Sequence, residues 1–234
     1  MRKKQKILPA IAVALLFLHI TGIINTDGLK HRAISAVAEI GTESVLIIDA
    51  GHGGADGGAV ATDGTLESSI NLDIALKLDN LAHIFGVNSL LTRSSEILAY
   101  PEDKTTISDM KRWDQKTRLK LINSVSNAVL ISIHQNKFPD GKPFGPQVLY
   151  GNDGESEYFG TLCHDYLNTY LCPQNRRVAT PAPKDIFLIK NAACTAILVE
   201  CGFLSNANDL IMLCKADYQT KIAAVLLSAY LNYI

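Results

Sequence analysis

Residues 45–54 read VLIIDAGHGG, a run of four apolar residues followed at once by an aspartate, a histidine and glycines. Four buried-type residues in succession are typical of an interior strand in a sheet that is covered on both faces. The glycines around His52 favour a tight turn and let another group approach the backbone closely. We therefore expect His52 at the C-terminal edge of a sheet, where open α/β proteins bind their ligands.

Apolar runs alternate with stretches of helical periodicity through the rest of the chain. The predicted helices are 67–85, 118–125, 155–171 and 216–233. The predicted further strands are 87–91, 128–134, 147–150 and 195–200, and the polar residues 94–113 are predicted to form a long loop. Strands that alternate with helices predict a single α/β domain, with a mostly parallel twisted sheet of about six strands and helices on both faces.

The N-terminus has the composition of an export segment. Four of the first six residues are basic and an apolar stretch follows up to residue 24, a combination that predicts export or membrane anchoring. The small residues Ala36, Val37 and Ala38 leave open whether the segment is cleaved or retained. Residues 25–43 are predicted to be a linker, and residues 44–234 are predicted to be a domain that works outside the cytoplasm, anchored to the membrane or secreted.

Charge and cysteine content narrow the class of protein. The net charge of −1, with no basic patch beyond the N-terminus, argues against nucleic acid as a partner. The five cysteines are odd in number and lack C-x-x-C spacing, so they do not indicate a disulfide framework. Most of them are expected to be small buried side chains.

Three predicted strands lead into residues that can bind a metal or move a proton. His52 follows the first strand, and His134 and Glu200 end two later strands. Parallel strands share one C-terminal edge, and Glu67, on the sheet-facing side of the first turn of the next helix, reaches the same rim. Two histidines and a carboxylate with an open fourth position suit a catalytic zinc ion. Glu200 is then free to act as general base and general acid.

Each of these residues taken alone has an ordinary structural explanation. A histidine at a strand end is more often a hydrogen-bonding residue, and Glu67 would favour the N-terminus of its helix. Glu200 could form an ion pair with Arg93 or Arg118 and take no part in chemistry. All of these explanations would have to hold together, so the joint pattern favours the metal site.

The same motifs, in this order, resemble those of a known family. They are IDAGHGG at 48–54, Glu67, SIHQN at 132–136 and VECGFLSN at 199–206. In combination they resemble the zinc-dependent N-acetylmuramoyl-L-alanine amidases of the amidase-3 type, over residues 45–232. The resemblance implies zinc on His52, Glu67 and His134, and Glu200 as the catalytic acid and base. It also implies that peptidoglycan is the substrate, contacted through its stem peptide and its glycan strand.

Further stretches resemble the germination-specific amidases of spore-forming bacteria. They are TLESSINLDIALKL at 65–78, HQNKFP at 134–139, GPQV at 145–148 and DIFLIK at 185–190, with Pro146 as a departure where a small residue is expected. The resemblance implies that the enzyme strips peptides from muramic acid, a step toward muramic-δ-lactam in the spore cortex. It also implies a location between the spore membranes and an accessory lipoprotein.

Four more residues near the expected site each have two open interpretations. Asp49 would orient a metal-binding histidine or cap the glycine turn. Asn136 would position the substrate or the metal-binding loop, or satisfy loop backbone groups. Arg93 and Arg118 would pair with substrate carboxylates or Glu200, or form structural ion pairs.

Three alternative functions remain open from the sequence. Cys201, beside Glu200, could form a thiol hydrolase with His134 and Asp49, which a chelator would not inhibit. A non-catalytic module could hold wall glycan in the same groove, although binding alone does not need the acid at Glu200. The same amidase activity could also serve vegetative cell separation rather than sporulation.

Overall fold

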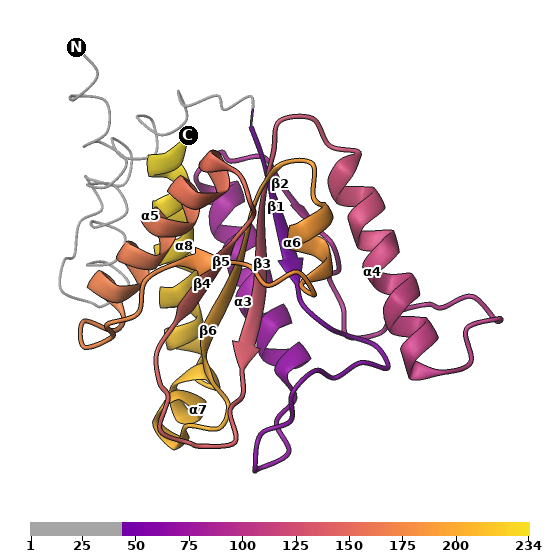
Figure 1. The fold of residues 1–234 in the computed structure, drawn as a ribbon, viewed down its shortest axis with the longest axis horizontal. Helices are drawn as coiled ribbons and strands as arrows, with labels where there is room; N and C mark the ends of the chain where they lie inside the picture. Colours follow the sequence, from indigo (N-terminus) through magenta and orange to yellow (C-terminus); the bar gives the residue numbers. More distant parts are fainter. Residues whose placement is uncertain (1–43) are drawn as a thin grey trace.

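A six-stranded sheet forms the centre of the computed structural model, which describes residues 44–234 (Figure 1). Its strands are β1 (Val45–Ala50), β2 (Ser89–Leu91), β3 (Ala128–Asn136), β4 (Gln147–Tyr150), β5 (Thr180–Pro181) and β6 (Thr195–Phe203). They lie in the order β2-β1-β3-β6-β4-β5. Every neighbouring pair is parallel except β4 with β6. The predicted mostly parallel sheet is therefore confirmed.

Helices cover both faces of this sheet, as predicted. Helices α3 (Glu67–Ile84), α5 (Gly154–Tyr170) and α8 (Ala216–Tyr233) pack together on one face. Helices α4 (Ile107–Asn123) and α6 (Phe187–Asn191) lie on the other face, to the right in Figure 1. Helix α7 (Ala207–Leu213) follows β6 and packs against α8.

The alternation of side chains along each strand divides the core in two. A large cluster lies under α3, α5 and α8, and a smaller one, which contains Ile47, Leu130 and Leu198, faces α4 and α6. Successive side chains in a strand point to opposite faces. His134 lies four residues after Leu130, and Glu200 lies two after Leu198, so both project on the face of α4 and α6. The smaller layer on this face leaves room for a pocket at the strand ends.

Helix α3 forms as its periodicity predicts. Its buried stripe contains Ile70, Ile74, Leu78 and Leu81. Glu67 belongs to the same stripe and is only 3% exposed, which confirms that it projects toward the sheet.

Several regions differ from the prediction. The stretch 94–113 is not one loop, because α4 begins at Ile107, where the side chain of Thr106 caps it by accepting a hydrogen bond from the backbone N–H of Asp109. Only Arg118 and Ile122 of this helix are buried, so it lacks the apolar periodicity that reveals a helix. The elements β5, α6 and α7 were not predicted because they have two, five and seven residues.

The five cysteines are all free thiols. Cys163, Cys172 and Cys201 are buried, which confirms that most of them serve as small core side chains.

The predicted export segment, residues 1–24, and the linker, residues 25–43, lie outside the described residues, so both stay predictions. Among residues 44–234, no helix has the length and apolar character needed to cross a membrane.

Candidate metal centre and active site

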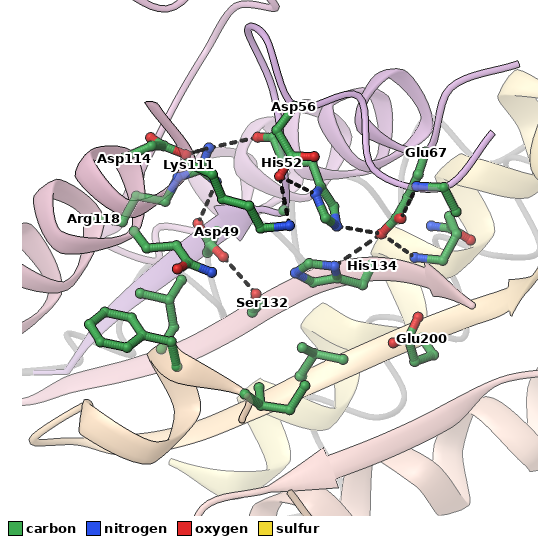
Figure 2. Close-up of a pocket in the computed structure, with 18 of the residues that line it drawn as sticks. Asp49, His52, Asp56, Glu67, Lys111, Asp114, Arg118, Ser132, His134 and Glu200 are labelled. Atoms are coloured by element: carbon green, nitrogen blue, oxygen red, sulfur yellow. Dashed lines mark hydrogen bonds and ion pairs between the residues drawn. The ribbon is translucent and has the colours of Figure 1, made fainter. Parts of the chain in front are cut away.

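Three side chains from three segments meet at the C-terminal edge of the sheet (Figure 2). His52 lies in the turn after β1, Glu67 in the first turn of α3, and His134 near the end of β3. The Glu67 carboxylate lies between the two rings, because its Oε1 is 3.3 Å from Nε2 of His52 and 3.0 Å from Nδ1 of His134. Each residue offers a donor atom within 4.8 Å of the others, so the group could hold a metal ion.

Glycines make this close approach possible. A Cβ atom on Gly51 would lie 2.2 Å from Nε2 of His134, so no larger residue fits against that ring. Gly58 has a φ of +70°, and a Cβ there would lie 2.6 Å from Oε2 of Glu67. His52 itself has a φ of 60°, a strained conformation for a non-glycine residue that is often found at functional sites. The sequence indicated a glycine turn, and the structure shows that the turn clears space for the side chains of Glu67 and His134.

Glu67 is held as an ionised acceptor. The backbone N–H groups of Ala59 and Gln135 donate to its two oxygens at 2.9 and 3.1 Å. Burial alone would raise the pKa of Glu67, but hydrogen bonds to His134 and His52 outweigh it and hold that pKa well below its usual range. A permanently charged carboxylate between two imidazoles favours a bound cation.

Asp56 holds the His52 ring from the other side, a contact that sequence reasoning missed. Oδ2 of Asp56 lies 2.9 Å from Nδ1 of His52. Burial lowers the pKa of His52, but Asp56 and Glu67 together outweigh it and raise that pKa to about 9. Asp49 was one residue predicted for this orienting role, but the contact to the ring is made by Asp56. The sequence feature that could have revealed this contact is an acid four residues after His52 in the same glycine-rich turn.

Glu200 lies beside His134 with an unpartnered oxygen. The two residues are in register on the parallel strands β3 and β6, so they project on the same face. Oε2 of Glu200 is buried and has no hydrogen-bond partner. Burial raises the pKa of Glu200 to about 7; the negative charge of Glu67 also raises it, while His134 and His52 oppose the shift. A carboxyl that exchanges its proton near neutral pH is suited to general acid–base work.

The two strands were predicted to end at His134 and Glu200. In the structure they continue to Asn136 and Phe203. Pairing resumes between Asn136 and Phe203 after an irregularity that follows His134. Such bulges often occur next to active sites, where they change the direction of a side chain. Asn136 lines the pocket, and its backbone carbonyl accepts a hydrogen bond from the N–H of Leu204. Its role toward the substrate stays a prediction.

Asp49 is fully buried and has three hydrogen-bond donors of its own. They are the hydroxyls of Ser132 and Thr92, both at 2.6 Å, and Nη1 of Arg118 at 3.0 Å. Burial alone would raise the pKa of Asp49, but Arg118 and the two hydroxyls outweigh it and hold that pKa below 3.8. The carboxylate therefore fixes Arg118. Its hydrogen bonds go neither to His52 nor to the backbone of the glycine turn.

Arg93 and Arg118 hold the backbone of the glycine turn. Arg118 donates to the carbonyl oxygens of Ala50 and His52, both at 2.6 Å. It also forms ion pairs with Asp49 of β1 and with Asp114 of α4. Arg93 donates to four backbone carbonyls, including that of Ala50 at 2.8 Å. Both side chains are buried. The interpretation as structural residues therefore agrees with the geometry, and neither arginine forms the ion pair with Glu200.

A pocket with a cavity volume of about 410 Å³ extends from the group of His52, Glu67 and His134 along the residues of α4 and α6. Its lining includes the two histidines, Glu67 and Glu200, together with Lys111, Gln115 and Phe187. Sites for small ligands have volumes of a few hundred cubic ångströms and combine apolar walls with a few placed polar groups. The arrangement can therefore admit part of a larger substrate.

Cys201 is unsuited to the thiol mechanism. Cys201 follows Glu200 in β6, so its side chain points to the opposite face of the sheet. It belongs to the large core under α8 and is 3% exposed. Burial raises the pKa of its thiol far above the ordinary value. Because the thiolate is the nucleophile, this side chain has neither the ionisation nor the access that a thiol hydrolase requires.

Two histidines and a glutamate beside a buried, unpartnered carboxyl, at the edge of a mainly parallel sheet, are the features of a metal-dependent hydrolase. The family model Amidase_3, described as N-acetylmuramoyl-L-alanine amidase, matches residues 46–231. The chain belongs to this family of enzymes, which confirms the predicted family and fold.

Named relatives agree with this membership. The chain is 33% identical over its whole length to the germination-specific N-acetylmuramoyl-L-alanine amidase of Bacillus subtilis, of which it covers 96%. It is 25% identical to the amidase LytC of the same organism over 89% of this chain and 39% of LytC. Among solved structures, the CwlD amidase of Clostridioides difficile, in complex with the GerS lipoprotein, matches with a TM-score of 0.78 and 34% identity. That match covers 81% of this chain and 98% of CwlD.

Proposed function

We propose that this enzyme uses zinc to hydrolyse the amide bond between N-acetylmuramic acid and L-alanine in peptidoglycan. The observation that carries the proposal is the group of His52, Glu67 and His134, with Glu200 beside it. Two imidazole nitrogens and a carboxylate oxygen are a donor set of catalytic zinc, which keeps a fourth position open for water or substrate. The residues present therefore fit the metal.

Zinc bound by these three side chains would supply a Lewis acid that acidifies water and polarises the lactyl carbonyl. Glu200 takes a proton from the attacking water and then delivers it to the leaving nitrogen of L-alanine. Its buried Oε2 has no competing hydrogen-bond donor, so the carboxyl is available in both steps. Asn136, at the wall of the pocket, contacts the substrate or supports the loop beside it.

The biochemical test uses the purified enzyme and peptidoglycan. We expect one zinc per chain by elemental analysis, and released peptides whose new N-terminus is L-alanine. His134→Ala should lose both the metal and peptide release, because only two metal ligands remain. Peptide release that survives complete removal of zinc by a chelator would contradict the mechanism. A zinc-loaded enzyme that binds peptidoglycan but releases no peptide would indicate the wall-binding module instead.

The biological role that we propose is the production of peptide-free muramic acid for muramic-δ-lactam in the spore cortex. Identity to the germination-specific amidase of Bacillus subtilis across the full chain supports this role. The complex of the similar CwlD amidase with the GerS lipoprotein supports an accessory lipoprotein as a partner here. Because the substrate is wall peptidoglycan, the enzyme acts outside the cytoplasm, with residues 1–24 as the export signal or membrane anchor, in the space between the spore membranes.

Deletion of the gene separates this role from vegetative cell separation. The spore role predicts normal cell division and a cortex without muramic-δ-lactam, measured by muropeptide chromatography of purified spores. Chained vegetative cells with an unchanged cortex would favour the alternative role.

A further inference from the structure

The turn that carries His52 is closed by Asp56, whose two carboxylate oxygens have different partners. Oδ1 accepts a hydrogen bond from the backbone N–H of Gly58 at 3.2 Å. Oδ2 lies 2.9 Å from Nδ1 of His52 and 3.0 Å from Nζ of Lys111, which extends from α4 (Figure 2). The backbones of Asp56 and Gly53 also exchange two hydrogen bonds, at 2.8 and 3.1 Å. The carboxylate is therefore anchored to its own turn while it holds the imidazole.

This contact determines which nitrogen of His52 faces the metal position. An imidazole that donates its Nδ1–H to a carboxylate carries its lone pair on Nε2. Nε2 is the nitrogen that lies 3.3 Å from Oε1 of Glu67. A carboxylate that accepts the other ring N–H fixes the orientation of a metal-binding histidine and increases its basicity. His52 needs such support because its φ of 60° does not by itself define the ring direction.

We propose that Asp56 is the positioning residue that prepares His52 for metal binding, and that Lys111 weakens this effect by sharing Oδ2. The inference rests on the proposed zinc site. Asp56 acts through the imidazole and touches no substrate. Lys111 is half exposed and lines the pocket, so the wall formed by α4 is linked to the metal site through one carboxylate.

The primary experiment measures zinc affinity of the full chain by competition with a chromogenic chelator. Asp56→Asn should weaken zinc binding about 10- to 100-fold, the usual effect of losing the hydrogen-bond partner of a metal ligand. Asp114→Asn is the matched control, because Asp114 is another acid of the same pocket that pairs with Arg118. The control should stay within about threefold of wild type, because Asp114 pairs with Arg118 and is not the hydrogen-bond partner of a metal ligand. Equal affinities in wild type and Asp56→Asn would overturn the inference.

A second readout separates positioning from simple support of the turn. Nitrogen-15 NMR of the histidine rings reports which nitrogen carries the proton in the zinc-loaded enzyme. Wild type should show His52 with a proton on Nδ1 in slow exchange, and Asp56→Asn should lose that signature while its metal-free unfolding midpoint stays near that of Asp114→Asn. An unchanged ring signature would overturn the positioning role.

Lys111→Met on its own gives a first measurement that does not depend on how Asp56→Asn folds. Removal of the competing cation should tighten zinc binding about two- to fivefold, as expected for an exposed ion pair. The gain should disappear in the Asp56→Asn background, because the shared carboxylate is then gone. Weaker binding, or an equal gain in both backgrounds, would overturn the part assigned to Lys111.

The two proposals fail in different ways. A wild-type enzyme that binds no zinc overturns the proposed function. A wild-type enzyme that binds one zinc, loses it in His134→Ala and keeps its affinity in Asp56→Asn overturns only this inference.

Discussion

Asp49 of β1 and Glu200 of β6 project on the same face of the sheet, yet the two acids differ in their hydrogen bonding and in the direction of their pKa shifts. Asp49 of β1 accepts hydrogen bonds from Ser132, Thr92 and Arg118. Glu200 of β6 has an oxygen with no partner at all. The pKa of Asp49 is lowered, whereas burial raises the pKa of Glu200 to about 7.

The contrast separates a carboxylate that supports the structure from a carboxyl group that is suited to acid–base chemistry. A buried carboxylate with several donors stays ionised and fixes its neighbours, here the arginine that holds the His52 carbonyl. A buried carboxyl without donors costs stability, and such groups occur where a shifted pKa is needed for function. Mutation of Glu200 should therefore affect activity, and mutation of Asp49 should affect stability.

The largest expected effect is that of Glu200→Gln. Loss of the general base and acid should lower kcat about 10²- to 10⁴-fold, measured as peptide release from peptidoglycan. Zinc content should stay at the wild-type level, and the free energy of unfolding should not fall, because no hydrogen bond to Oε2 is lost. Turnover close to wild type would remove Glu200 from the mechanism.

Asp49→Asn should instead reduce the free energy of unfolding, by about 3–5 kcal/mol, because it leaves Arg118 buried without its full charge partner. Urea denaturation at pH 7 measures the change. Ser132→Ala is the milder comparison, since it removes one hydrogen bond to the carboxylate and leaves the ion pair with Arg118 in place, and it should cost about 1.5–3 kcal/mol. A variant of Asp49 as stable as wild type would show that the buried pair contributes little.

The same pair predicts a dependence on pH that Asp49→Asn lacks. The pKa of Asp49 is lowered on folding from 3.8, so its contribution is fully present above that value and is lost as the pH falls through the folded pKa. The stability difference between wild type and Asp49→Asn should narrow as the pH decreases below about 4. Urea midpoints of both proteins at successive pH values test this, and a constant difference would contradict it.

The smallest effect is expected for Cys201→Ala, next to Glu200 on the same strand. The thiol is buried in the core away from the pocket, so peptide release should stay within about twofold of wild type, as for an apolar substitution of small volume. Iodoacetamide should leave the activity of native enzyme unchanged for the same reason. Loss of activity in Cys201→Ala, with zinc and fold intact, would revive the thiol mechanism.

Sequence reasoning succeeded where the signal is local. The apolar run before His52 predicted β1, and the periodicity from Ile70 to Leu81 predicted both α3 and the inward direction of Glu67. It failed where the deciding contact is distant or the element is polar. The start of α4 was missed because few of its residues are buried, and Arg118 could not be assigned because its partner Asp49 is 69 residues away.

Local sequence patterns predicted every strand except β5, the principal helices and the order of the candidate metal-binding residues, because alternation and helical periodicity depend on near neighbours in the chain. Which groups each acid contacts follows from the tertiary fold alone. Asp56 rather than Asp49 holds His52, since the turn folds back on itself. Glu200 has its unpartnered oxygen because β6 pairs in register with β3 and buries it beside His134. Hydrogen bonding and desolvation, which set the charge of a carboxyl group, depend on neighbours that only folding brings together.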